Sequence, residues 1–271
     1  MDRLSERLTV AYFLYVAAIA PFFIPRPWRA WLFASVVAAS LWLLGRWTTM
    51  ARDFAPVAAT LAAYREMDWF AFVPHDHHLE RAWVAWDRLL LDGYHLRAAI
   101  ESAGAILPGV FELCYLLVYA VGPAVVITAI AARRRDGMDQ LWMAYLAGTL
   151  GAYALFPYFP SDPPRTAFPG ADLPHVITAL RRLNLFIVGG YGIHSSVFPS
   201  AHVSSAFSAA WGLLKTIPER RWIGWSMAAY AVLVSIATIY GRYHYAADVA
   251  AGFTVSLLAI PAARMGRESD R

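Results

Sequence analysis

Two histidines and one aspartate have the residue types and the spacing of a nucleophile with its proton-transfer partners. His244 and Asp248 are four residues apart in "RYHYAADVA", so they share one face of a helix. The carboxylate can accept the Nδ1 proton of the imidazole and leave Nε2 free as a nucleophile or base. His202 begins an apolar run two residues after Ser200, where a serine N-cap and free backbone N–H groups favour an anion. Together these residues indicate phosphoryl transfer.

A phosphoryl group in transfer needs positive charge around its oxygens. Lys215 is thirteen residues beyond His202 on the same predicted helix, about 20 Å away at 1.5 Å per residue, which is too far. Arginines must therefore supply the charge. Arg165 follows two prolines, which stiffen the chain and hold its guanidinium at low entropic cost. The other candidates are Arg242, two residues before His244, and Arg181 with Arg182.

The composition predicts that membrane helices position these residues. The 271 residues are 59% hydrophobic and 15% charged, with a mean hydropathy of +0.45. Several apolar runs approach the roughly 20 residues that a helix needs to cross a bilayer, and the alternating pattern of an outer-membrane barrel is missing. We therefore expect an all-α, polytopic membrane helix bundle with six or seven transmembrane spans. The candidate spans are residues 8–24, 29–47, 108–131, 139–158, 200–216, 222–241 and 245–263.

The basic residues predict the orientation. They cluster at the ends of apolar runs, at residues 133–135, 220–221 and 264–271, and the positive-inside rule places all three clusters in the cytoplasm. A net charge of +4 therefore reflects topology, and we expect no nucleic-acid partner. Alternation puts residues 159–199 and His244 on the extracytoplasmic face, and counting backward puts the N-terminus there as well. The oligomeric state is not encoded in any pattern that we find.

We expect one membrane domain over residues 1–271. It comprises N-terminal spans (1–47), an interfacial segment rich in Trp and Arg (48–107) and a catalytic helix bundle (108–263). Cys114 is the chain's one cysteine, so no intrachain disulfide can form. "HDHH" at residues 75–78 does not place two imidazoles on one helical face beside a third ligand, and we expect no metal site there. The chemistry requires no cofactor.

The same residues resemble the type-2 phosphatidic acid phosphatase and vanadium haloperoxidase superfamily. Its second motif, P-S-x-H, matches Pro199 to His202, and its third motif ends H-x-x-x-D, which matches His244 and Asp248. The resemblance covers about residues 155–255. It implies that His244 is the nucleophile, that Asp248 orients it and that His202 is the acid. A phosphohistidine intermediate would follow.

Two positions depart from the superfamily's pattern. The lysine that usually comes seven residues before the arginine of the first motif is Tyr158 here, and the usual arginine six residues before His244 is Thr238. Tyr158 is therefore a candidate phosphate ligand beside Arg165, Ser200 and Arg242. Both departures, with the "PPR" element, resemble the branch that contains inositol phosphorylceramide synthase, the aureobasidin A target.

The resemblance implies an integral membrane lipid phosphotransferase. We expect it to move a phospho-headgroup from a phospholipid donor to a lipid hydroxyl acceptor, with the active site on the extracytoplasmic face. The first alternative is a lipid phosphate or isoprenyl diphosphate phosphatase, which uses water at the same site. A non-catalytic lipid-binding membrane protein is less favoured because all three catalytic residues are present. Vanadate-dependent halide oxidation is disfavoured because the expected site lies in membrane and has few cations.

Overall fold

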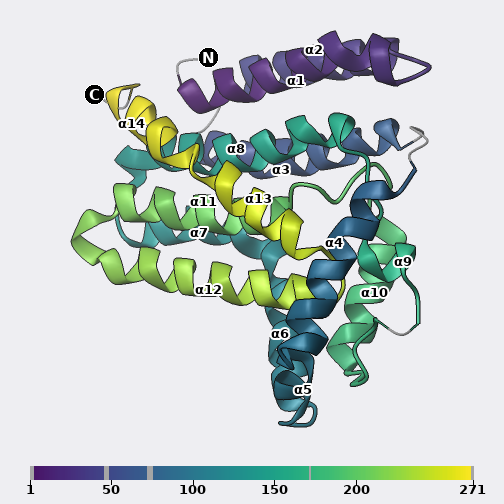
Figure 1. Ribbon diagram of the computed structural model, residues 1–271. Coiled ribbons are helices and arrows are strands. Elements are labelled where there is room, and N and C mark those ends of the chain that lie inside the picture. Colours follow the sequence, from purple (N-terminus) through teal and green to yellow (C-terminus); the bar gives the residue numbers. More distant parts are fainter. Residues whose placement is uncertain (1–2, 46–48, 72–75, 171, 270–271) are drawn as a thin grey trace.

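The computed structural model describes residues 3–45, 49–71, 76–170 and 172–269, and within these ranges it is helical without strands (Figure 1). The helices are α1 Leu4–Phe23, α2 Trp28–Leu44, α3 Thr49–Met67, α4 His78–Arg88, α5 Leu96–Glu101, α6 Ile106–Leu117, α7 Val121–Ala131, α8 Met138–Leu155, α9 Pro164–Ala167, α10 Ala179–Tyr191, α11 Ala201–Thr216, α12 Arg221–Tyr240, α13 Ala246–Ser256 and α14 Ala259–Ser269. The single turn Val118–Ala120 joins α6 to α7, and Asp68–Phe70 extends α3.

Four helical segments are long and apolar enough to cross a membrane, within the part of the chain that the structure describes. They are Leu4–Phe23, Ile106–Ala131, Pro218–Tyr240 and Ala246–Arg267. Many of their large apolar side chains, such as Phe22, Ile127 and Trp222, face outward. Because lipid is the solvent that tolerates such a surface, the protein is an integral membrane protein.

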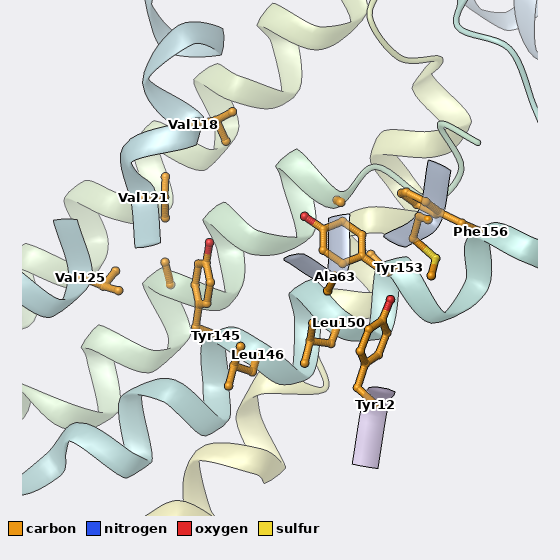
Figure 2. Packing of buried hydrophobic residues seen from close by; sticks show 14 of the residues in the cluster. Tyr12, Ala63, Val118, Val121, Val125, Tyr145, Leu146, Leu150, Tyr153 and Phe156 are labelled. Atoms are coloured by element: carbon orange, nitrogen blue, oxygen red, sulfur yellow. The ribbon is translucent and has the colours of Figure 1, made fainter. Parts of the chain in front are cut away.

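Helix α8 lies at the centre of the bundle, and most of its residues are buried. It packs against α1, α3, α11 and α14 (Figure 1). Gly148 permits the contact with α11, because a Cβ atom there would lie 1.9 Å from Oγ of Ser208. Figure 2 shows apolar side chains of the α6–α7 segment, including Val121 and Val125, near Tyr145 and Leu146 of α8. This close packing fixes α11, whose first turn contains His202.

Both described ends of the chain lie at the end of the bundle that contains the arginine clusters (Figure 1). The backbone N–H of Leu4 donates to Asp139, at the start of α8, over 2.8 Å. The sequence predicted the N-terminus at the opposite end, and the structure differs because α3 adds one more traverse. Asp53 near the start of α3 pairs with Arg135, whereas Asp68 just beyond α3 contacts His194 at the active-site end.

The described residues of the 48–107 segment, which we expected to be interfacial, form two parts. Helix α3 runs beside α8 inside the bundle, where its Asp53 is neutralised by Arg3 and Arg135. Helices α4 and α5 lie at the active-site end, beyond the ends of the long helices (Figure 1). Trp83 of α4 stacks on Phe198 with ring centroids 5.0 Å apart. Helix α4 thus packs directly on the loop that leads into α11.

Candidate active site

The two histidines meet at the junction of α11 and the α12–α13 loop. Nδ1 of His202 lies 3.1 Å from Nε2 of His244. Nδ1 of His244 lies 3.0 Å from the carbonyl oxygen of Val197 and 3.3 Å from Oδ2 of Asp248. Since a carbonyl oxygen can only accept, Nδ1 of His244 has the proton and donates it to both oxygens. Nε2 is therefore unprotonated and has the lone pair that a nucleophile requires.

The surroundings of His244 keep its imidazole neutral. It lies in the connection between two spans and is almost completely buried. Burial, followed by the positive charge of Arg165, lowers the pKa of His244 to about 3, against the opposing effect of the hydrogen bond to Val197. Because a pKa this far below the ordinary value of an imidazole favours the neutral ring, the lone pair on Nε2 is available throughout the neutral pH range.

The start of α11 has the serine N-cap that the sequence predicts, and Ser200 is buried outside the described lining of the reaction pocket. Oγ of Ser200 accepts from the backbone N–H of Val203 over 3.4 Å and caps the helix. The backbone N–H of Ser200 donates to the carbonyl oxygen of Asp248 over 2.9 Å, which joins α11 to the first turn of α13. Gly252 makes this possible, since a Cβ atom there would lie 2.4 Å from the carbonyl oxygen of Ser200. Both histidines are thus fixed to one rigid junction.

Arg165 lines the same pocket as the two histidines. The pocket measures about 50 Å³, and Arg165 is the one arginine or lysine among its described lining residues. Its backbone N–H donates to the carbonyl oxygen of Arg242 over 3.1 Å, and its guanidinium lies 5.4 Å from the ring centre of Tyr243. Arg165 also lines an adjoining cavity of about 260 Å³ with Asp162 and His194. We call these two spaces the reaction pocket and the polar cavity.

The structure does not bring Arg242 to the reaction pocket. Its side chain is fully buried and pairs with Asp87 of α4, which is also fully buried. The other oxygen of the same carboxylate accepts from the backbone N–H of Ala246 over 2.8 Å. One carboxylate therefore holds both sides of the His244 loop. The expected phosphate-binding role of Arg242 is not supported, and its position indicates that it orients the loop.

A second buried network holds the loop from the other side. Glu112 of α6 pairs with Arg181 over 2.8 Å and accepts from the hydroxyl of Tyr243 over 2.7 Å. Arg181 also donates to the carbonyl oxygen of Gly241 over 3.2 Å. The sequence reasoning named Arg181 as a possible phosphate ligand and missed Glu112. An acidic residue within a long apolar run was the available signal, because ionisable groups in membrane helices are costly unless paired.

Two further candidates lie away from the histidines. Tyr158 is 47% exposed and lies outside the reaction pocket. Its hydroxyl lies 3.1 Å from the hydroxyl of Tyr15. This placement does not support a phosphate-binding role for Tyr158. In the "HDHH" stretch, His77 pairs with Glu80 and His78 with Asp76, and His75 lies outside the described residues. The described residues contain no group of three side chains placed to hold a metal ion.

A larger cavity, about 630 Å³, lies away from this site. It is lined by Arg26, Arg29 and Trp69 among others, and by none of the three catalytic candidates. Size alone therefore does not locate the chemistry. The site has a neutral histidine with an unprotonated Nε2, a second histidine in contact with it, a carboxylate and one arginine. These are the groups that phosphoryl transfer through a histidine would need.

A family model described as the PAP2 superfamily matches residues 81–262, and because this is more than half of the chain, the protein belongs to that superfamily. It is a phosphatase-like enzyme, and the membership suggests a lipid phosphatase or phosphotransferase. No curated protein and no solved structure matches the chain. The matched region begins within α4 and includes His202, His244 and Asp248.

Proposed function

We propose that this protein is a lipid phosphotransferase that takes a phospho-headgroup from a phospholipid and passes it to a lipid hydroxyl through phosphohistidine at His244. The proposal rests on one observation: Arg165 supplies the only arginine or lysine charge in the described lining of the reaction pocket. A phosphodiester has one negative charge, whereas a phosphomonoester has about −1.5 to −2 at pH 7. One guanidinium therefore matches a phosphodiester donor better than a lipid monophosphate.

The residues divide the reaction as follows. Nε2 of His244 attacks phosphorus, while Asp248 and the Val197 carbonyl hold its Nδ1 proton. His202 protonates the oxygen of the leaving alcohol and then accepts a proton from the incoming hydroxyl. Arg165 binds the phosphoryl oxygens through its planar fork. Because His202 now contacts the attacking nitrogen at 3.1 Å, its ring must rotate away to admit phosphorus.

Limited access of water favours transfer over hydrolysis. Helix α4 packs on the loops that surround His244, through Trp83 on Phe198 and Asp87 on Ala246. A phosphohistidine in such a pocket meets few water molecules, so a positioned alcohol competes by its high effective concentration. Limited access of water also favours a relation to the branch that contains inositol phosphorylceramide synthase. The alternative remains a lipid phosphate or isoprenyl diphosphate phosphatase with water as acceptor.

The test compares donors and acceptors with purified protein. We expect a phosphodiester phospholipid to be used with a kcat/KM about tenfold or more above that of phosphatidic acid. Adding a lipid alcohol should convert released headgroup phosphate into lipid-linked product. Arg165→Ala should lower kcat/KM by about 10² for either donor, and Arg165→Lys should restore only part of it, since an ammonium lacks the fork. Arg182→Ala, at an exposed arginine of α10, is the matched control.

Faster use of phosphatidic acid than of any phosphodiester, with water as the acceptor whatever alcohol is added, would favour the phosphatase instead. Full activity of Arg165→Ala would remove Arg165 from the phosphate site.

We also propose eight traverses of the membrane, the seven that the sequence predicted and α3, with the active site on the extracytoplasmic face. Besides the four long apolar segments, α2, α3, α8 and α11 run in the same bundle (Figure 1). The support for the orientation is the arginine clusters at the opposite end. Cysteine introduced at exposed Ile177 should react with an impermeant thiol reagent in intact cells, and cysteine at exposed Arg220 should react only after lysis. Buried Cys114 should stay unlabelled. The reverse pattern would place the active site in the cytoplasm.

A further inference from the structure

A second cavity adjoins the reaction pocket, and the proposed catalytic roles leave it unused. It measures about 80 Å³ and lies between α3, α8, α11 and the turn that joins α6 to α7. We call it the tyrosine chamber because five tyrosines line it. They are Tyr64, Tyr119, Tyr145, Tyr153 and Tyr191. It is continuous in its lining with the reaction pocket, since Tyr64, Tyr119, Ala201 and His202 belong to both.

The chamber touches one catalytic histidine and not the other. His202 lines both spaces, whereas His244 and Arg165 line the reaction pocket and not the chamber. In phosphoryl transfer the attacking and leaving atoms lie roughly in line on opposite sides of phosphorus. The leaving oxygen is therefore on the side of phosphorus away from His244, where its proton donor His202 must be. Because His202 also lines the chamber, the chamber is the space next to this proton donor.

The chamber wall has many hydroxyl groups and no charge. Thr60, Thr149 and Ser205 each donate their hydroxyl proton to a carbonyl oxygen of their own helix, so they offer lone pairs to a ligand. Tyrosine hydroxyls can donate as well as accept. Figure 2 shows the hydroxyls of Tyr145 and Tyr153 on the side of α8 that faces Val118. No Asp, Glu, Lys or Arg is among the described lining residues. Such a wall suits a neutral alcohol and penalises a charged group.

The volume of the chamber and the exposed residues at its edge indicate which part of a lipid alcohol it can hold. Its volume, about 80 Å³, has room for about five water-sized groups, enough for a hydroxyl carbon and its neighbours but not for an acyl chain. Leu61 and Tyr191, which are 46% and 42% exposed, lie at its edge. An apolar chain attached to the alcohol can leave between them toward lipid.

We propose that the tyrosine chamber is the shared site of the leaving and the accepting alcohol. This inference rests on the proposed transferase function. Nε2 of His244 bonds to phosphorus as the ester P–O bond breaks, and His202 gives its proton to the departing alcohol oxygen in the chamber. A second neutral lipid alcohol then occupies the same place. His202 takes its proton, its oxygen bonds to phosphorus, and the P–N bond breaks to restore neutral His244. The transferred headgroup remains on the side of Arg165 and the polar cavity.

The test uses variants that change the volume or the hydroxyl groups of the chamber and leave the proposed phosphate ligand, Arg165, in place. Thr149→Leu fills the chamber from α8, and Tyr153→Phe removes one hydroxyl while keeping the ring. We expect the KM for the lipid alcohol to rise about tenfold or more in Thr149→Leu, and the phosphoenzyme to partition toward water. Inhibition by orthovanadate, which needs His244 and Arg165 but no alcohol, should stay within about twofold. Tyr12→Phe, at a buried tyrosine of α1 outside the chamber, should leave all three values unchanged.

The outcomes separate the two proposals. If wild-type protein forms no phosphoenzyme and is not inhibited by vanadate, the proposed function fails. If wild-type protein forms phosphoenzyme and both chamber variants keep the wild-type KM for the alcohol, the chamber assignment is overturned. Should Thr149→Leu not fold, Tyr153→Phe still decides, with an expected severalfold rise in the alcohol KM from the lost hydrogen bond.

Discussion

Replacing His244 by alanine should remove all measurable turnover together with all labelled phosphoenzyme. In the reaction pocket, the proton of His244 is held on Nδ1 by the Val197 carbonyl and Asp248, which leaves the lone pair on Nε2. Without it no P–N bond can form, and the donor alcohol has no nucleophile to displace it. The measurement is a single-turnover reaction with a phosphorus-labelled phospholipid, stopped in alkali so that phosphohistidine survives.

The control for this experiment is His175→Ala. His175 is an exposed histidine that pairs with Glu101 outside the reaction pocket, so its loss should leave label and turnover near wild type. Turnover of His244→Ala within about threefold of wild type would exclude a phosphohistidine mechanism.

His202→Ala should slow both halves of the reaction, each by about 10² to 10⁴-fold, the usual cost of losing a general acid and base. His202 is the histidine that lines both the reaction pocket and the tyrosine chamber, so it can reach the alcohol oxygen in either half. A nitrophenyl ester donor tests this directly. Its leaving oxygen needs no proton, so labelled phosphoenzyme should form at a nearly normal rate, while transfer to an alcohol stays slow. An equal deficit with both donors would contradict the acid role.

The catalytic trio could be predicted because its signals are local. His244 and Asp248 are four residues apart, and Ser200 precedes His202 at a helix start, so each placement depends on one helix turn. The structure then adds what local spacing cannot give. The hydrogen bond from His244 to the Val197 carbonyl spans 47 positions of sequence, and it fixes the tautomer together with Asp248.

The role of Arg242 could not be predicted, because its partner is remote. Asp87 is 155 residues away in a segment whose charges had indicated only an interfacial helix. The traverse by α3 was missed for a similar reason. Its Asp53 lowered the apparent hydropathy, but Arg3 and Arg135 neutralise that charge inside the folded protein. A hydropathy pattern therefore fails to predict a buried helix when the charges of that helix are neutralised by residues remote in the sequence.

The tyrosine chamber did leave a signal in the sequence. Tyr145, Thr149 and Tyr153 are spaced by four in the apolar stretch of α8, so three hydroxyl side chains share one helix face. A hydroxyl-bearing stripe on an otherwise apolar helix marks a polar space inside a bundle. What the sequence could not show is that this stripe faces His202, which depends on how α8 packs on α11.

The two bonds of Asp87 set a lower limit on any minimal version of this enzyme. A fragment that starts after α4 would keep His202, His244 and Asp248, yet it would leave the guanidinium of Arg242 charged and unpaired in the protein interior. Removing one partner of a buried ion pair costs about 3 to 5 kcal/mol, a large part of the stability of an ordinary domain. The family match begins at residue 81, inside α4. The smallest stable version of this enzyme therefore includes α4, although α4 contributes no reacting atom.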